Sequence, residues 1–391
     1  MHFLREKFEK HVAATSSSPM GIAIERAEGL WLYGIDGKRY LDMIAGIAVS
    51  NLGHSHPAIV AAVQAQVARY MHLMVYGELI QEPQVDLADL LCQHLPPVLS
   101  SVYFVNSGTE AVEGALKLAK RVTGRQEIVC CNNAYHGCTH GSMSLIGSQE
   151  YHEAFAPLLP QVRRVRFGVL EDLEQITSRT ACFITELVQG EAGVRTASPE
   201  YWQAARTRCN ETGTLFIADE IQTGIGRTGK LFAFEHYNIV PDILVLAKAL
   251  GGGMPVGAFI ASREQMLALT HHPMLGHMTT FGGHPVCCAA ALAHLQIITR
   301  QQYWKQVDRL GKQLKNVLQK YPGVREIRQI GLMLAVDFKD ETTAMTAYKT
   351  WLDRGIFIDW FLFCPTALRI APPLIINEDD IQEFEQRIYE K

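Results

Sequence analysis

The sequence lacks any uninterrupted apolar run near the ~20 residues that a membrane-spanning helix requires. It also lacks an excess of basic charge, because 36 Lys and Arg residues stand against 40 Asp and Glu residues and the formal net charge is −4. Its first residues, Met1 to Lys10, are charged throughout and lack the apolar core of a signal peptide. We therefore expect a cytoplasmic protein that binds neither a membrane nor nucleic acid.

Cysteine and histidine form no disulfide or metal-binding pattern. The nine Cys are an odd number, and the adjacent pairs Cys130-Cys131 and Cys287-Cys288 lack metal-ligand spacing. The 15 His include no set at the spacing of a tetrahedral site. We expect reduced thiols, which are typical of a reducing compartment, and no metal site.

Internal repeats, low-complexity tracts and long linkers are absent as well. The pattern of apolar residues and turn signals, however, changes along the chain. Short apolar segments between the turn signals Glu28-Gly29 and Asp36-Gly37 predict a small antiparallel meander. From Val102 onward, strand, turn and helix patterns alternate, which indicates an α/β fold with a mostly parallel sheet and helices on both faces. The expected strands are 102–105, 127–131, 162–167, 181–185, 215–218, 243–246 and 256–261.

After about residue 282 the pattern changes to a smaller α+β unit. Helices are expected over 284–299 and then along Val307, Leu310, Leu314 and Leu318, followed by strands near 324–338 and 367–371 and a closing helix from about 378. We expect a large domain over 51–282, a small C-terminal domain over 283–391, and an N-terminal segment, 1–50, that packs with the small domain.

Two ionisable residues each follow a short apolar strand. Asp219 ends Leu215 to Ala218, and Lys248 follows Ile243 to Ala247 and precedes a run of glycines. Ligands in open α/β sheets bind beyond the carboxyl ends of strands, and a desolvated amine is a usable nucleophile toward an aldehyde. Pyridoxal phosphate needs such a pair, since the amine bonds its aldehyde and the carboxylate keeps its ring nitrogen protonated. A structural ion pair is the alternative.

Three further stretches carry candidate chemistry. Ser107-Gly108-Thr109 lies between a strand and a helix and could bind a phosphate or serve only as a helix cap. Tyr135 in Tyr-His-Gly could stack on a flat ring or simply pack in a loop. Glu186 and Glu191 follow another strand, and an Arg at 369 suits carboxylate binding, although nothing local ties positions 191 and 369 together.

Several motifs along nearly the whole chain resemble those of class III pyridoxal-phosphate aminotransferases, and most of all the acetylornithine/ornithine group. They are Ser107-Gly-Thr-Glu-Ala, Glu186-Leu-Val-Gln-Gly-Glu, Ala218-Asp-Glu-Ile-Gln-Thr-Gly-Ile-Gly-Arg-Thr-Gly, Leu246-Ala-Lys-Ala-Leu-Gly-Gly-Gly, Thr279-Thr-Phe-Gly-Gly-His-Pro and Leu368-Arg-Ile-Ala-Pro-Pro-Leu. The resemblance implies fold type I of the pyridoxal-phosphate enzymes, with a seven-stranded sheet, and a homodimer with its active site at the subunit interface.

The resemblance also implies roles for individual residues. Lys248 would be the Schiff-base lysine and Asp219 the partner of the ring nitrogen, while Gln222 would bind the ring hydroxyl. The other residues expected to contact the cofactor are Ser107, Gly108, Thr109, Tyr135, His136 and Thr280 of the partner subunit. Those expected to contact the substrate are Ile47, Cys138, Glu186, Glu191, Thr279 and Arg369, with Glu191 neutralising Arg369 until a dicarboxylate arrives.

Two positions depart from the family pattern. The family's usual His-Gly-Arg reads His136-Gly137-Cys138, so the common substrate-carboxylate Arg is missing. Ile47 stands where ornithine aminotransferases have Tyr, which resembles the acylated-ornithine branch. The implied reaction moves the terminal amino group of an ornithine-like donor to an oxo acid such as 2-oxoglutarate. Ile47 in place of Tyr favours a donor that is N-acylated. A 4-aminobutyrate or diamine transaminase, an aminomutase, and a non-catalytic regulator that binds a phosphate ligand are the alternatives.

Overall fold

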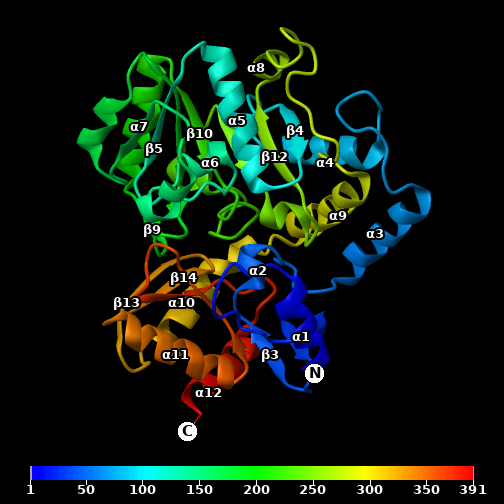
Figure 1. The fold of residues 1–391 in the computed structure, drawn as a ribbon, viewed down its shortest axis with the longest axis vertical. Coiled ribbons are helices and arrows are strands. Elements are labelled where there is room, and N and C mark those ends of the chain that lie inside the picture. Colours follow the sequence, from blue (N-terminus) through cyan, green and yellow to red (C-terminus); the bar gives the residue numbers. More distant parts are fainter. Residues whose placement is uncertain (1, 391) are drawn as a thin grey trace.

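A seven-stranded sheet forms the upper part of the molecule in a computed structural model that describes residues 2–390 (Figure 1). Every pairing in this sheet is parallel except the two that β12 makes with β4 and β11. The expected α/β fold with a mostly parallel seven-stranded sheet is thus confirmed. In spatial order its strands are β4 (Ser101–Val105), β12 (Gly257–Ala261), β11 (Ile243–Leu246), β10 (Leu215–Asp219), β7 (Thr180–Glu186), β5 (Glu127–Cys131) and β6 (Val162–Val165).

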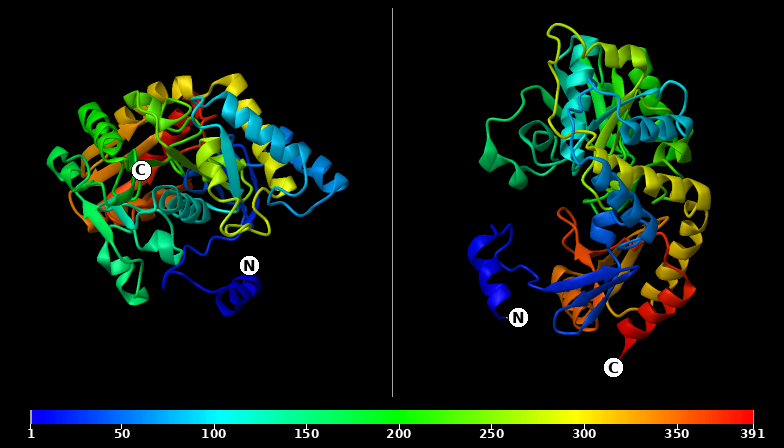
Figure 2. Two further views of the ribbon diagram at one scale, coloured as in Figure 1. Left: turned by 90° about the horizontal axis from the view of Figure 1, so that it is seen from above. Right: turned by 90° about the vertical axis from the view of Figure 1, so that its right-hand side faces the viewer.

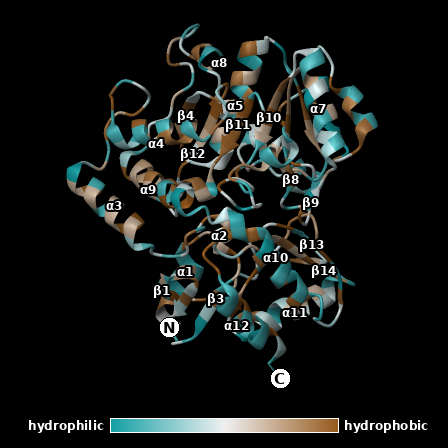
Figure 3. Cartoon of the chain, turned by 180° about the vertical axis from the view of Figure 1, so that it is seen from behind, coloured by the Kyte–Doolittle hydropathy of each residue, from teal (hydrophilic) through white to brown (hydrophobic). Residues whose placement is uncertain are grey.

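Helices cover both faces of this sheet, which explains why its central strands are apolar without alternation. On one face α5 (Gly108–Thr123) packs against alternate strand residues such as Ile217 and Val245. On the other face α7 (Pro199–Thr212) and α9 (Pro285–Gln301) cover residues such as Phe216 and Leu244. Figure 3 shows the resulting hydrophobic colour of β10 and β11 in the middle of the upper part of the molecule.

The lower part of the molecule joins the two ends of the chain, which both lie there in Figure 1. The N-terminal meander of β1 (Ile24–Glu28), β2 (Trp31–Gly34) and β3 (Arg39–Asp42) is extended by β15 (Ile356–Phe357), which pairs with β3. A second sheet consists of β13 (Val324–Ile330), β14 (Met333–Phe338), β17 (Ala367–Ile370) and β16 (Asp359–Trp360). The helices of this part are α10 (Trp304–Leu318), α11 (Glu341–Asp353) and α12 (Glu378–Tyr389).

The two parts are connected by α9 and α10, which follow one another down one side of the molecule (Figure 2). At its upper end α9 packs against α3 (Pro57–Arg69) and α4 (Glu82–Gln93), whereas α10 packs against β13 and α12. The division of the chain at residues 50 and 282 stays a prediction. The remaining α-helices and strands are α1 (His2–His11), α2 (Ala45–Ala48), α6 (His140–Met143), α8 (Arg263–Leu267), β8 (Val188–Gln189) and β9 (Arg195–Thr196).

None of the helices within residues 2–390 is both long enough and apolar enough to cross a membrane.

The contact between α5 and β12 has no room for an added methyl group. A Cβ at Gly114 would lie 2.3 Å from Cε1 of Phe259, a side chain that is fully buried. We expect Gly114→Ala to destabilise the protein by about 1–3 kcal/mol, because overpacking forces the ring or the helix to shift. The measurement is the thermal unfolding midpoint, followed by circular dichroism. In the double variant with Phe259→Leu the two losses should be less than additive, and strict additivity would contradict this account.

Candidate active site

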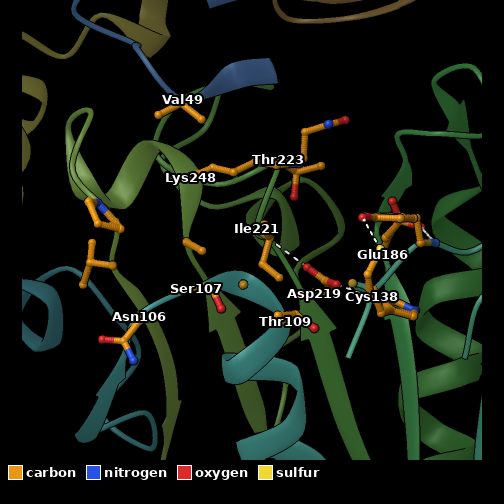
Figure 4. A pocket seen from close by; sticks show the side chains of 18 of the residues that line it. Val49, Asn106, Ser107, Thr109, Cys138, Glu186, Asp219, Ile221, Thr223 and Lys248 are labelled. Carbon is orange, nitrogen blue, oxygen red and sulfur yellow. Dashed lines mark hydrogen bonds and ion pairs between the residues drawn. The ribbon is translucent and has the colours of Figure 1, made fainter. Parts of the chain in front are cut away.

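A cavity of about 560 Å³ lies at the carboxyl edge of the upper sheet, where β7, β10 and β11 end (Figure 4). Its size is typical of a site for a small ligand. Most of its side chains come from the turns that follow strands, and Val49 comes from the segment after α2. The sequence-predicted residues that line it are Ser107, Gly108, Thr109, Tyr135, His136, Cys138, Glu186, Glu191, Asp219, Gln222 and Lys248.

Asp219 is held in this cavity as a buried, hydrogen-bonded acid. Its Oδ2 lies 2.7 Å from Nδ1 of His136, and its Oδ1 accepts a hydrogen bond from the backbone N–H of Ile221 at 3.0 Å. Burial disfavours the charged form of His136, but the hydrogen bond and the charge of Asp219 outweigh it and raise the pKa of His136. The contacts with His136 and with the backbone of Ile221 therefore fix the position of the Asp219 carboxylate at the wall of the cavity.

Glu186 ends β7 directly beside Asp219, with which it is paired in the strand register. Its carboxylate accepts hydrogen bonds from the backbone N–H groups of Tyr135 at 3.1 Å and Gly190 at 3.0 Å. Burial raises the pKa of Glu186 to about 7, although the charge of His136 lowers it. The contacts of Glu186 hold the two loops that follow β5 and β7 against each other, so it fixes the backbone from which Tyr135 extends.

Cys138 is an exposed thiol at the wall of the cavity, in the loop that carries Tyr135. The hydroxyl of Tyr135 lies 3.1 Å from Sγ of Cys138. Between them Gly137 has φ +120°, and a Cβ there would lie 2.4 Å from Oγ1 of Thr109. Only glycine therefore lets this loop approach the start of α5 so closely.

Lys248 follows β11 and enters the cavity with an unusual backbone conformation. Its φ is +46°, a region that non-glycine residues rarely adopt and that marks many functional sites. Its side chain is half-buried, and burial lowers the pKa of the amine, although Glu191 opposes the shift and Arg369 adds to it. The amine is thus shifted toward the neutral, nucleophilic form.

The start of α5 provides backbone donors on the opposite wall. Ser107 caps this 16-residue helix by accepting a hydrogen bond from the N–H of Glu110 at 3.3 Å, so the cap that the sequence allowed is present. The N–H groups of Gly108 and Thr109 belong to the first turn, which has no intrahelical acceptor for them. Oγ1 of Thr109 is itself held 2.6 Å from Oγ of Ser142. An anion in the cavity would meet the positive end of the helix here.

Glu191 and Arg369 form a buried ion pair, with 2.5 Å between Oε2 and Nη2. The sequence had offered no local link between these positions, and the structure supplies one. Oε2 of Glu191 also accepts the N–H of Leu362 at 3.1 Å. Nε and Nη1 of Arg369 are buried without a hydrogen-bond partner in the part of the chain that the structure describes.

Four of the expected site residues do not line the main cavity. Ile47 and Arg369 line a much smaller space of about 10 Å³ beside it, and Gln222 lines both. Thr279 accepts a hydrogen bond from the side-chain amide of Asn106 at 3.0 Å. Thr280 is exposed on the surface of its own chain. All four of their expected roles remain predictions.

Several residues that line the main cavity were not expected from the sequence. They are Val49, Asn106, Val188, Ile221, Thr223, Met254, Pro255 and Val256. Asn106 could have been noticed, because it precedes the Ser-Gly-Thr motif, whereas the apolar ones carry no signal that separates a cavity wall from a core. Among residues 2–390, no three His, Cys, Asp or Glu side chains gather as the ligands of a metal would.

Comparisons with known proteins all give the same kind of relative. Residues 12–390 match the family model described as aminotransferase class-III. The chain is 38% identical to the acetylornithine aminotransferase of Caldanaerobacter subterraneus subsp. tengcongensis, over 96% of each chain. It is 40% identical to that of Methanopyrus kandleri, over 97% of this chain and 96% of the relative. It superposes with a TM-score of 0.91 and 28% identity on the ornithine aminotransferase of Toxoplasma gondii, covering 99% of this chain and 93% of that one. That structure has partial occupancy of PLP at its active site.

The lowered pKa of Lys248 predicts a pH-dependent penalty on stability in the ligand-free protein. The neutral amine is favoured in the folded chain, so the penalty is absent above the unfolded pKa of about 10.4, grows as the pH falls below that value, and is complete below the lowered pKa of the folded chain. We expect Lys248→Met to raise the thermal midpoint at neutral pH and the gain to shrink toward pH 10. Lys305→Met, at an exposed lysine, is the control and should show no such gain. An equal effect of both variants would contradict the prediction.

Proposed function

The chain belongs to the class-III aminotransferase family, and from that premise we propose that it moves the terminal amino group of an ornithine-like donor to an oxo acid, with pyridoxal phosphate as its cofactor. The family matches the one that the sequence motifs resemble. The single observation that carries the proposal is that the half-buried amine of Lys248 shares one cavity with the buried carboxylate of Asp219 and the start of α5. These are the three groups that this cofactor requires.

The residues present fit the cofactor group by group. The first turn of α5 and the hydroxyls of Ser107 and Thr109 would hold its phosphate, and Gly137 keeps the cradle around Thr109 open. Asp219, supported by His136, would stand at the ring nitrogen, and Tyr135 would stack on the ring face. When bound, the cofactor supplies an electron-withdrawing ring that takes up the negative charge developing on the substrate.

Lys248 does the proton chemistry in this proposal. Its desolvated amine would hold the cofactor through its aldehyde, and the same amine, once released by the substrate amine, would carry the proton that the reaction moves. The contacts with His136 and with the N–H of Ile221 would hold the Asp219 carboxylate in place at the ring nitrogen. Gln222, which lines both cavities, would bind the ring hydroxyl.

The pair of Glu191 and Arg369 would let one cavity accept two differently charged partners. Glu191, at 2.5 Å from Arg369, would neutralise the Arg369 charge while the amino donor is bound, because the side chain of the donor carries no second carboxylate. A dicarboxylate such as 2-oxoglutarate would displace Glu191 and receive the bidentate contact that Arg favours. The two buried nitrogens of Arg369 that lack partners within residues 2–390 support this exchange.

The finer assignments rest on the relatives. The curated relatives are named acetylornithine aminotransferases, and Ile47 favours the same branch, so we propose an N-acylated ornithine as donor. We also propose a homodimer in which Thr280 of the partner subunit completes the phosphate site, because Thr280 is exposed on its own chain. All nine Cys are free thiols, which supports a reducing compartment such as the cytoplasm.

The first test removes the amine. Lys248→Ala should lose at least about three orders of magnitude in turnover, since nucleophile and proton carrier are the same group. It should also form no adduct with pyridoxal phosphate that borohydride can reduce. The measurements are the half-reaction rate with N-acetylornithine and the mass of the reduced protein. Wild-type protein that takes up no pyridoxal phosphate would instead favour a non-catalytic phosphate-ligand-binding regulator.

The second test concerns Cys138, which stands where an arginine would bind a substrate carboxylate. We expect Cys138→Arg to improve kcat/KM for 2-oxoglutarate or for the acylated donor by about tenfold, because it adds a charge-assisted contact. Cys138→Ser, which adds no charge, is the matched control. Half-reactions with N-acetylornithine, N-succinylornithine, ornithine and 4-aminobutyrate give the readout. An unchanged profile would mean that the carboxylate is anchored elsewhere, and a preference for 4-aminobutyrate would reject the ornithine-like donor.

A further inference from the structure

Arg227 is a fully buried cation that touches neither cavity. It lies on the loop between β10 and the segment 233–237, the same loop that carries Gln222. Its Nη2 donates to Oδ1 of Asn51 at 2.6 Å, and its Nη1 donates to the carbonyl oxygens of Leu332 at 3.1 Å and Pro372 at 2.5 Å. One guanidinium therefore joins three segments that are far apart in the sequence.

Asn51, which is also fully buried, completes the junction. Its side-chain amide donates to the carbonyl of Ile225 at 2.8 Å, and its backbone carbonyl accepts the N–H of Leu374 at 2.7 Å. The backbone carbonyl of Arg227 in turn accepts the N–H of Leu332 at 3.0 Å. We name the side chains of Arg227 and Asn51, with the backbone groups that they bind, the Arg227 clamp.

Three of the segments that the clamp joins carry an expected site residue or a residue that lines the main cavity. Gln222 precedes Arg227 on its loop, Val49 precedes Asn51, and Arg369 precedes Pro372. Gln222 and Arg369 line the small second cavity together with Ile47. The clamp is thus a buried junction that connects the three segments carrying Gln222, Val49 and Arg369.

The segment beside Asn51 needs such support. Residues 45–48 all have positive φ values, from 50° to 64°, and three of them are not glycine. Asp42 holds the start of this segment, because its Oδ1 accepts the N–H groups of Ile44 and Ala45 at 2.9 Å each. Strain of this kind persists only where the surrounding structure fixes it, and the other end is fixed by Asn51.

We propose that the Arg227 clamp is a positioning device for the substrate carboxylate, because it sets the separation of Arg369 from Gln222 and from the 45–49 segment. This inference rests on the proposed function. Arg227 itself contacts no cavity and is not a catalytic residue. Lysine is a poor replacement, because its ammonium carries all three donors on one nitrogen, whereas Arg227 reaches its acceptors from two nitrogens of a planar guanidinium.

The test compares Arg227→Lys and Asn51→Ala with a matched control at Arg125. Arg125 also bridges three acceptors, the backbone carbonyls of Thr180, Thr212 and Gly213, at 2.9 to 3.0 Å, but it lines neither cavity. Its replacement by lysine should lower the thermal midpoint without changing substrate binding. A weaker binding of substrate that appears in the clamp variants but not in Arg125→Lys is then specific to the clamp. It cannot be the result of lower stability alone.

In the cofactor-loaded enzyme we expect Arg227→Lys to raise the KM for 2-oxoglutarate and the Kd for glutarate, a non-reacting dicarboxylate, by at least roughly tenfold. Cofactor affinity, the cofactor absorbance spectrum and kcat should change by less than about threefold. Asn51→Ala should change KM and Kd in the same direction, and the two substitutions together should be less than additive because they act on one network.

Hydrogen exchange gives a readout that does not depend on activity. In Asn51→Ala, backbone amides of 43–53 and 370–374 should lose protection while those of β10 keep it. If Arg227→Lys does not fold, Asn51→Ala decides the question. Unchanged KM and Kd in the clamp variants, with a stability loss like that of Arg125→Lys, would overturn the inference. Wild-type enzyme without aminotransferase activity would reject the proposed function instead, and hydrogen exchange and glutarate binding would still test the clamp.

Discussion

The pairing of buried charges at the carboxyl edge of the sheet is the constraint on which the site depends. Strands covered on both faces can end in ionisable residues only if each charge finds a partner, because desolvation of an unpaired charge is costly. Asp219 has His136, Glu186 has two backbone N–H groups, and Glu191 has Arg369. Burial raises the pKa of Glu186 and lowers the pKa of Lys248, and the charges and hydrogen bonds of their neighbours offset these shifts only in part. The same burial that stabilises the fold therefore prepares the amine for nucleophilic chemistry.

The second requirement is that segments from opposite ends of the chain meet above this edge. The N-terminal meander and β15 share one sheet, and the backbone N–H of Ala371 donates to the carbonyl of Met43 at 2.7 Å. These contacts bring Ile47 and Arg369 to one small cavity. Arg227 adds a buried charge to the junction, where burial lowers its pKa to about 9 although Asp42 opposes the shift. A buried cation bound to carbonyl groups of separate segments gives directional restraint that apolar packing does not.

Much of the fold could be predicted from local patterns. β5 and β11 have the expected bounds, and the other expected strands of the upper sheet begin or end within about two residues of theirs. Two of the longer helices, α7 and α11, are absent from the sequence-based expectations although their signals are present. Ser198 caps α7 before Pro199 and Gly213 ends it, and Asp340 caps α11. The apolar stripe of α7 is short, because this helix is polar on average and buries only four residues, Tyr201, Trp202, Ala205 and Cys209, so its sequence shows little helical period.

The sequence by itself determined which chemical groups stand at strand ends, because a short apolar run followed by Asp219 or Lys248 specifies both the strand and the rim on which its last residue lies. It also contained the Ser-Gly-Thr helix start and the departure at Cys138. Only the tertiary structure decided that Glu191 meets Arg369, that His136 supports Asp219, and that Arg227 joins three segments. Local patterns encode the period of one helix or strand and the groups at its ends. A contact across many residues depends instead on how all the elements pack, and no pattern within one segment records that.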